Sequence, residues 1–382
     1  MARRARDYKD GVKPHAYYDY ALLFLTVFMV CFGLVMIYSA SSYISMIKYK
    51  NTYYFLRKQA ISAAIGVVAM IVVSKIPYGI YIKPLTKFRF RLIYLLYLVC
   101  FGLQALVLVK GKDINGAKRW LSIAGISFQP SEICKILAVL FVSFVVCQAP
   151  KKMDHFTGFL RVMLYMAPIL ALIAKENLST AIIIAGILVT ICFVGSREKK
   201  YYVLVVLLGI AGIMAYIFGV GYRSNRVWIW RNLENSGDAG LQILQGLYAI
   251  ANGGFWGKGL GQGMQKLGKI PEAYNDMIFS VICEELGFFG AIVVILLFIM
   301  MCYRIFIIAI SAPDMFGGLI CSGVLAQIAL QVIINIAVVT NSIPSTGIAL
   351  PFISYGGTSV AILLAEMGIV LSVSNQISEQ KG

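Results

Sequence analysis

Long apolar stretches separated by polar segments dominate the chain. A helix that crosses a bilayer needs about 20 apolar residues for a hydrocarbon core of roughly 30 Å. Stretches near this length lie at residues 20–42, 59–76, 90–109, 131–149, 159–174, 178–195, 201–220, 277–303, 316–340 and 358–375. The pattern predicts an all-α, polytopic integral membrane bundle of about ten transmembrane helices.

The polar segments leave one transmembrane domain, residues 20–375, between a basic tail at 1–19 and a short tail at 376–382. A long loop, 221–275, separates the seventh and eighth apolar stretches. The segment 341–357 mixes proline and glycine with apolar residues. Irregular backbone at membrane depth is stable only where protein or a water-filled cavity covers it. We therefore expect this segment to re-enter the bundle and to line a cavity.

Composition agrees with a membrane location. Hydrophobic residues make up 60% of the chain and charged residues 13%, against roughly 45–50% and about 25% in soluble domains. Lys and Arg favour the side of the N-terminus once the loop 221–275 is set aside, since long loops translocate largely regardless of charge. Both termini are therefore expected in the cytoplasm, with 221–275 and 341–357 on the outer, extracytoplasmic side.

Few residues suit metal binding or nucleophilic catalysis. The eight cysteines are scattered through apolar stretches without a Cys-x-x-Cys pair, which indicates core residues rather than a disulfide framework or a zinc site. The only histidines, His15 and His155, fall in segments expected in the cytoplasm. An outward Ser-His-Asp triad or His-based metal site is therefore disfavoured, and any metal would be a hard divalent cation such as Mg²⁺ held by carboxylates.

A carboxylate, Asp276, stands at the mouth of the eighth apolar stretch. Charge at such a place is costly and usually marks chemistry or transport. If Asp276 begins a helix, a polar stripe follows on its face, formed by Ser280, Cys283 and Gly287, with Glu272 one turn before and Glu284 to one side. This stripe is too polar for lipid, and it predicts a helix that lines a cavity with an acidic rim.

Two other polar segments lie in the predicted outer loops. Lys118 and Arg119 stand with Trp120 shortly before a helix-start signal at 129–132. They either bind a phosphate near the helix N-terminus or anchor the chain at the membrane interface. The glycine alternation at 257–263 lacks the spacing of a phosphate loop and predicts a flexible outer turn.

Polar residues also lie within the last two stretches. Glu366 is mid-span, where a lone charge needs a partner. That partner is either Lys135 or the polar face of the ninth stretch, formed by Gln327, Gln331 and Asn335. A structural pair and a catalytic role are equally open.

Seven ordered motifs resemble one protein family. They are NGAKRWL, FQPSE, LSTA, GYRSNR, IPEAYND, EELGFFG and STGIALPFISYGGTS. Together they are similar to the FtsW/RodA/SpoVE (SEDS) family of cell-wall polymerases over residues 18–375, and 340–344 is closer to the FtsW and SpoVE branch. In one departure, 175–180 reads KENLST where the family often has EPDLGT, which excludes a catalytic carboxylate at position 177.

The resemblance implies a peptidoglycan glycosyltransferase that polymerises lipid II at the outer face of the bacterial cytoplasmic membrane, in division or sporulation. Asp276 matches the carboxylate of the family's PEAxxD motif, and a general base contributes roughly 10²–10⁴ in rate. The leaving lipid pyrophosphate needs Lys, Arg or Mg²⁺. The expected substrate contacts are Lys118, Arg119, Trp120, Arg223, Arg226, Glu272, Ser354 and Thr358.

The resemblance also implies partners, namely a class B penicillin-binding protein transpeptidase and other division proteins, and no nucleic acid. Two alternative functions are a non-catalytic division scaffold and a lipid II flippase. Transport needs polar groups through the membrane depth, and four such groups are Glu284, Gln331, Asn335 and Glu366. Polymerisation needs only one outward carboxylate, and we favour the enzyme.

Overall fold

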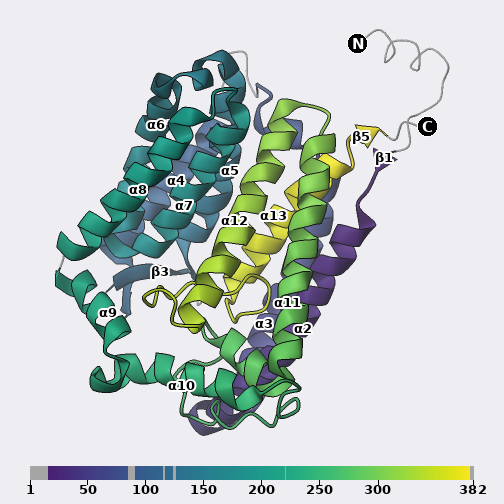
Figure 1. Ribbon diagram of the computed structural model, residues 1–382. Coiled ribbons are helices and arrows are strands. Elements are labelled where there is room, and N and C mark those ends of the chain that lie inside the picture. Colours follow the sequence, from purple (N-terminus) through teal and green to yellow (C-terminus); the bar gives the residue numbers. More distant parts are fainter. Residues whose placement is uncertain (1–15, 85–90, 115–116, 124–125, 220, 379–382) are drawn as a thin grey trace.

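The computed structural model describes residues 16–84, 91–114, 117–123, 126–219 and 221–378. These residues form a bundle of long helices with a few short strands (Figure 1). Most of the basic tail, the end of the chain after Ser378 and the first two residues of the NGAKRWL motif lie outside the described residues.

The long helices coincide with the apolar stretches. They are α2 (Tyr20–Tyr49), α3 (Tyr54–Lys75), α4 (Leu92–Lys110), α5 (Pro130–Gln148), α6 (Phe156–Glu176), α7 (Leu178–Gly195), α8 (Lys200–Gly219), α11 (Ile278–Ser311), α12 (Met315–Val339) and α13 (Thr358–Ser374). Among the described residues, 8 helices are long and apolar enough to cross a membrane, and α13 is a shorter apolar helix. The predicted fold class is confirmed.

The remaining elements are short or lie in the loops. They are β1 (Ala16–Tyr17), β2 (Lys112–Ile114), β3 (Ala117–Ile123), β4 (Ile126–Phe128), β5 (Ile377–Ser378), η1 (Tyr78–Tyr81), η2 (Pro150–Asp154), η3 (Leu233–Asn235), α9 (Gly221–Arg231) and α10 (Gly237–Gly253). β1 pairs with β5, and β2, β3 and β4 form an antiparallel sheet. In Figure 1, β1 and β5 lie at one end of the bundle, called the terminal end below, and α10 lies across the other, called the α10 end.

Local signals in the sequence explain two helix starts. α5 begins at Pro130, as its helix-start signal predicts, because proline at the first helical position has no amide hydrogen that needs a partner. α7 begins after Asn177, whose side chain accepts a hydrogen bond from the Thr180 amide at 3.2 Å. Asn177 is therefore a helix cap, which places the α6–α7 junction at a defined residue.

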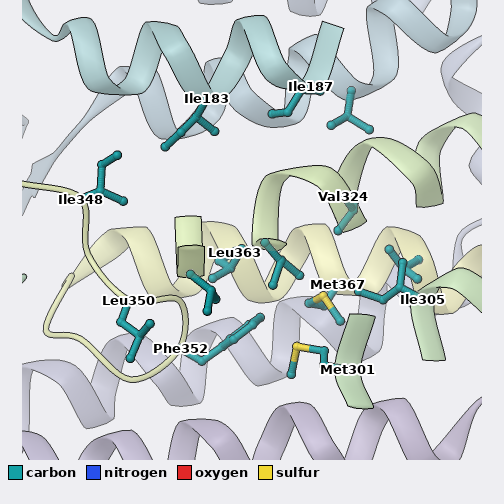
Figure 2. Packing of buried hydrophobic residues seen from close by; sticks show 14 of the residues in the cluster. Ile183, Ile187, Met301, Ile305, Val324, Ile348, Leu350, Phe352, Leu363 and Met367 are labelled. Atoms are coloured by element: carbon teal, nitrogen blue, oxygen red, sulfur yellow. The ribbon is translucent and has the colours of Figure 1, made fainter. Parts of the chain in front are cut away.

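The segment 341–357 has no regular structure, and its second half, from 348 to 354, is mostly buried in the bundle. Figure 2 shows Ile348, Leu350 and Phe352 among apolar side chains of α7, α11, α12 and α13. Gln59 of α3 fixes the end of the segment, because its Oε1 accepts hydrogen bonds from the amides of Gly356 and Gly357 at 3.2 and 3.0 Å. Protein therefore covers the second half of this irregular backbone, whereas Ser342 and Gly347 are exposed.

The start of α11 differs from expectation. The helix begins at Ile278, so Asp276 lies in the preceding turn and does not start it. Ser280, Cys283 and Glu284 are each at most 5% exposed. The expectation that they line a cavity is wrong, because α10 packs over Ser280 and Cys283 and the loop after α10 packs over Glu284.

That loop inserts its backbone into a break in α11. Gly287 has a non-helical φ of 69°, and a Cβ there would lie 2.3 Å from the Gly257 nitrogen, so only glycine fits. The Phe288 amide donates to the Gly254 carbonyl, and the Gly259 amide to the Glu285 carbonyl, both at 2.9 Å. The glycine-rich turn is therefore held against α11 by hydrogen bonds, contrary to the predicted flexible turn.

Candidate functional site

Asp276 lies at the α10 end, between the start of α11 and the irregular segment 341–357. Asn335 of α12 joins the two, because its Nδ2 donates to the carbonyl oxygens of Asp276 at 2.8 Å and of Ile348 at 2.7 Å. A Cβ built on Gly347 would lie 3.9 Å from Asp276 Oδ2. The carboxylate therefore faces the backbone of the segment near Gly347.

The surroundings of Asp276 shift its titration. The side chain is half-buried, and loss of water contact raises the pKa of the carboxyl to about 6. A hydrogen bond to its own backbone lowers this pKa, the charge of Glu272 raises it, and the charge of Arg226 lowers it. At neutral pH the group is therefore mostly ionised, with a much higher proton affinity than an exposed aspartate.

Residues of two other elements, α7 and α9, hold the segment that Asp276 faces. Arg226 of α9 donates from Nη1 to the Ser345 carbonyl at 3.1 Å, and Ser179 of α7 donates to the Thr346 carbonyl at 3.1 Å. Trp230 Nε1 of α9 donates to the Asn341 carbonyl at 2.8 Å. These contacts bring Arg226 and Asp276 to the same short stretch, although 50 residues separate them in sequence.

Lys118, Arg119 and Trp120 lie on β3, also at the α10 end. The Lys118 amide donates to Glu176 Oε2 and the Arg119 Nε donates to the Glu176 carbonyl, both at 2.8 Å. Glu176 ends α6, three residues before Ser179. These hydrogen bonds hold β3 beside the α6–α7 junction, and Ser179 of the same junction contacts the segment 341–357. The sequence did not single out Glu176 for this role.

The other expected substrate contacts have varied surroundings. Thr358 at the start of α13 donates to the Ser127 carbonyl of β4 at 3.2 Å, and Glu272 is exposed and accepts from Asn275 Nδ2 at 2.7 Å. Ser354 is 2% exposed, and its hydroxyl accepts from the Leu350 amide at 2.8 Å, so it holds the segment in shape. Arg223 lies on α9, one turn before Arg226.

An aromatic cluster beside Asp276 was not anticipated. The ring centroid of Tyr274 lies 4.3 Å from that of Phe55 and 5.6 Å from that of Tyr355. The Tyr355 amide donates to the Tyr274 carbonyl at 2.9 Å. The cluster therefore binds α3, the turn before α11 and the end of the segment 341–357 together. The spacing of these residues in the sequence gives no signal for it.

A buried charged network fixes the loop that leads to Asp276. Lys266 forms an ion pair with Glu285 of α11, and both contact Ser39 of α2, with Lys266 Nζ and Ser39 Oγ 2.7 Å apart. Neighbouring Glu284 accepts from the amides of Met264 and Gln265 at 2.9 and 3.2 Å. Adjacent glutamates at the start of an apolar stretch were the one signal that the sequence offered for this network.

A second polar group lies deeper in the bundle. Gln327 Nε2 of α12 donates to Glu366 Oε2 of α13 at 2.6 Å. Lys135 instead pairs with Glu132 on its own helix, at 2.9 Å. Of the two partners expected for Glu366, the polar face of α12 is thus the one within hydrogen-bond distance.

No group of three or more His, Cys, Asp or Glu side chains suited to a metal occurs within the part of the chain that the structure describes. At the site itself, Asp276 and Glu272 supply two carboxylates. Mg²⁺ is usually held by one or two carboxylates together with substrate phosphates. These residues therefore fit a cation that arrives with a phosphate-bearing substrate better than one held by protein alone.

The chain is similar to known proteins of one family. A family model described as cell cycle protein, for FtsW, RodA and SpoVE, matches residues 20–379. Stage V sporulation protein E of Bacillus subtilis (strain 168) is 35% identical over 361 residues, which cover 93% of this chain and 96% of that protein. The probable peptidoglycan glycosyltransferase FtsW of Geobacter sp. (strain M18) is 35% identical over 365 residues, or 94% and 97% of the two chains.

Solved structures share the fold. A chain from a peptidoglycan synthase complex, solved to explain how polymerization and crosslinking are coordinated, superposes with a TM-score of 0.77 at 26% identity, covering 95% of this chain and 99% of that one. The rod shape determining protein RodA of Thermus thermophilus superposes with a TM-score of 0.66 at 24% identity, covering 95% and 98%.

Proposed function

This chain belongs to the FtsW, RodA and SpoVE family of cell cycle proteins, and we infer that it is, like its FtsW relatives, a peptidoglycan glycosyltransferase. It is a multi-pass membrane protein. We propose that its substrate is lipid II, which it polymerises into glycan strands at the α10 end. The observation that carries this proposal is Asp276, a half-buried carboxylate with a raised pKa that faces the segment 341–357.

Asp276 suits the role of general base. Glycosyl transfer forms a bond between an acceptor hydroxyl oxygen and the anomeric carbon of the donor, and it breaks the bond from that carbon to the pyrophosphate oxygen. The hydroxyl proton moves to the carboxylate as the new bond forms. A pKa of about 6 leaves Asp276 ionised at neutral pH and nearer to the operating pH than an exposed aspartate, which favours proton transfer.

The leaving pyrophosphate gains charge as its bond breaks, so it needs cationic groups or a metal ion. Lys118 and Arg119 on β3, and Arg223 and Arg226 on α9, are the basic residues that we assign to it. A divalent cation such as Mg²⁺, held by pyrophosphate oxygens and Glu272, would neutralise part of the same charge.

Buried polar contacts favour the enzyme over a flippase. Glu284 accepts two backbone amides and Glu366 accepts the Gln327 side chain. Asn335 donates to two carbonyls. A transport path needs polar groups that exchange partners with a passing headgroup, whereas these contacts join parts of the protein.

A partner is proposed on similarity alone. One structurally similar chain comes from a complex that coordinates polymerization and crosslinking. We propose that this protein works with a class B penicillin-binding protein transpeptidase, as part of a larger set of division proteins. Co-purification of the two membrane proteins from cells that express both tests this pairing.

The central test replaces the Asp276 carboxylate with an amide of nearly the same shape, which cannot act as a base. Purified wild type and Asp276→Asn are incubated with lipid II, with and without the transpeptidase, and glycan polymer is measured. The variant should fold and insert but lose polymerisation by roughly 10²-fold or more. Asn275→Asp in an Asp276→Asn background is a matched control for carboxylate position and should not restore activity. Long glycan strands made by Asp276→Asn at near wild-type rate would refute the assignment.

A further inference from the structure

A large groove lies away from Asp276, between α4, α5 and α6. Its volume is about 880 Å³. Tyr97 and Leu98 of α4, Phe141 and Phe144 of α5, and Leu164 of α6 form much of its wall. The side chains of Leu98 and Leu164 are 59% and 70% exposed. The groove therefore opens on the side surface of the helix bundle, which faces the lipid in a membrane.

Contacts between α4, α5 and α6 hold the walls of the groove together. The Tyr97 hydroxyl of α4 donates to the Tyr165 carbonyl of α6 at 2.7 Å. The Tyr97 and Phe141 rings pack with centroids 4.9 Å apart. Pro168 also lines the groove and has no amide hydrogen for the carbonyl of Leu164, one turn before it. The groove is therefore bounded by packed side chains on three helices.

Basic residues stand at one end of this apolar groove. Lys152 of η2 and Arg161 of α6 line it where the chain passes from α5 to α6 at the terminal end. Arg161 Nε donates to the Tyr165 hydroxyl at 3.2 Å. In the part of the chain that the structure describes, the ion pairs involve neither Lys152 nor Arg161. A third cation, Arg91, lies over the Phe144 ring at 4.9 Å.

We propose that this groove binds an anionic phospholipid from the leaflet at the terminal end. The lipid phosphate lies between Lys152 and Arg161, and an acyl chain follows the apolar wall past Leu98 and Leu164. Charge complementarity argues for this occupant, because two cations that form no ion pair with any described residue stand at the mouth of an apolar groove that opens to the bilayer. The site is separate from Asp276 and does not depend on the proposed function.

Lipid selectivity tests the proposal directly. The purified protein is placed in nanodiscs of phosphatidylcholine alone or with phosphatidylglycerol, and the thermal unfolding midpoint is measured. Phosphatidylglycerol should raise the midpoint of the wild type. The variant Lys152→Gln/Arg161→Gln should bind it about 30-fold more weakly, since each basic residue near an anionic surface contributes ~1 kcal/mol.

A matched control removes the same charge elsewhere on the terminal end. Lys151→Gln/Arg197→Gln alters two exposed residues that do not line the groove. This variant should keep the full response to phosphatidylglycerol. An equal loss in both double variants would mean diffuse surface attraction and would overturn the site, as would a wild type that responds equally to both lipids.

A local probe keeps the test independent of folding of the charge variants. Leu164→Trp should be quenched more strongly by brominated phosphatidylglycerol than by brominated phosphatidylcholine, because tryptophan at 164 sits along the expected acyl chain. Equal quenching by the two lipids would contradict the proposal. Stabilisation by inorganic phosphate alone, to the same extent as by the lipid, would show an anion site without lipid and would also contradict it.

Discussion

The proton affinity of Asp276 depends on a few identified neighbours. Burial raises its pKa, Glu272 adds to the rise and Arg226 opposes it. Because a general base must be ionised, the fraction of competent enzyme falls as the pH falls through this pKa. The folded surroundings, more than the residue type, therefore set the pH range in which the proposed reaction runs.

The pH dependence of polymerisation should report this pKa. Below pH of about 6, kcat/KM for lipid II should fall about tenfold per pH unit. Arg226→Ala removes a charge that favours the carboxylate, so the acid limb should move to higher pH. Glu272→Gln should move it to lower pH. The control Arg231→Ala, exposed on the same helix, should leave it in place. If the acid limb lies at the same pH in the wild type and in all three variants, the assignment of Asp276 as the base is contradicted.

The sheet β2–β4 presents the cations that we assign to the pyrophosphate. Lys118→Ala and Arg119→Ala should lower kcat more than they raise KM, because the charge that they meet grows toward the transition state. Arg119→Lys should recover little activity if two guanidinium nitrogens bind the phosphate. Lys110→Ala, exposed at the end of α4, is the control. If the Lys118 and Arg119 variants have the same kcat and KM as this control, both residues are interfacial anchors and do not bind the pyrophosphate.

The side chains of Glu284 and Glu285 help to fix the loop between α10 and α11 to α11. Breaking a buried ion pair by removing one partner costs about 3–5 kcal/mol, because the other charge stays buried. Glu285→Gln and Lys266→Met should each lower stability strongly, and the double variant should lose less than their sum. Thermal unfolding in detergent measures this cycle.

The exposed ion pair between Glu198 and Lys200 is a control for the buried pair between Lys266 and Glu285. Glu198 and Lys200 are 53% and 69% exposed at 3.6 Å, so Glu198→Gln should cost at most about 1 kcal/mol. Polymerisation should also fall in Glu285→Gln, since the loop leads directly to Asp276, and should stay normal in Glu198→Gln. Full activity in a destabilised Glu285→Gln would show that the pair supports the fold without positioning the carboxylate.

At the scale of the whole molecule, orientation in the membrane decides whether Asp276 meets its substrate. Cysteine labelling, in a background with the native cysteines replaced, should find position 238 or 262 open to an impermeant reagent from outside. Position 152 or 199 should be closed to it, because the Lys and Arg distribution favours the terminal end in the cytoplasm. The reverse pattern would put Asp276 in the cytoplasm and rule out polymerisation at the outer face.

The helical bundle was predictable from the apolar stretches alone, because bilayer thickness fixes the length of each stretch and that length is a local property of the chain. The sequence also singled out Asp276, since a carboxylate beside an apolar stretch is conspicuous without any partner. The cavity predicted along the first turns of α11 was wrong, because local spacing cannot foresee that α10 and the loop after it pack onto this helix.

The partner of each polar group, in contrast, could be found only in the folded bundle. Lys266 meets Ser39 across 227 positions of sequence, and Asn335 reaches Asp276 across 59. The sequence offered two candidate partners for Glu366, and packing of α12 against α13 brought Gln327 to it. Such contacts depend on which helices become neighbours, and the packing of the folded bundle determines that.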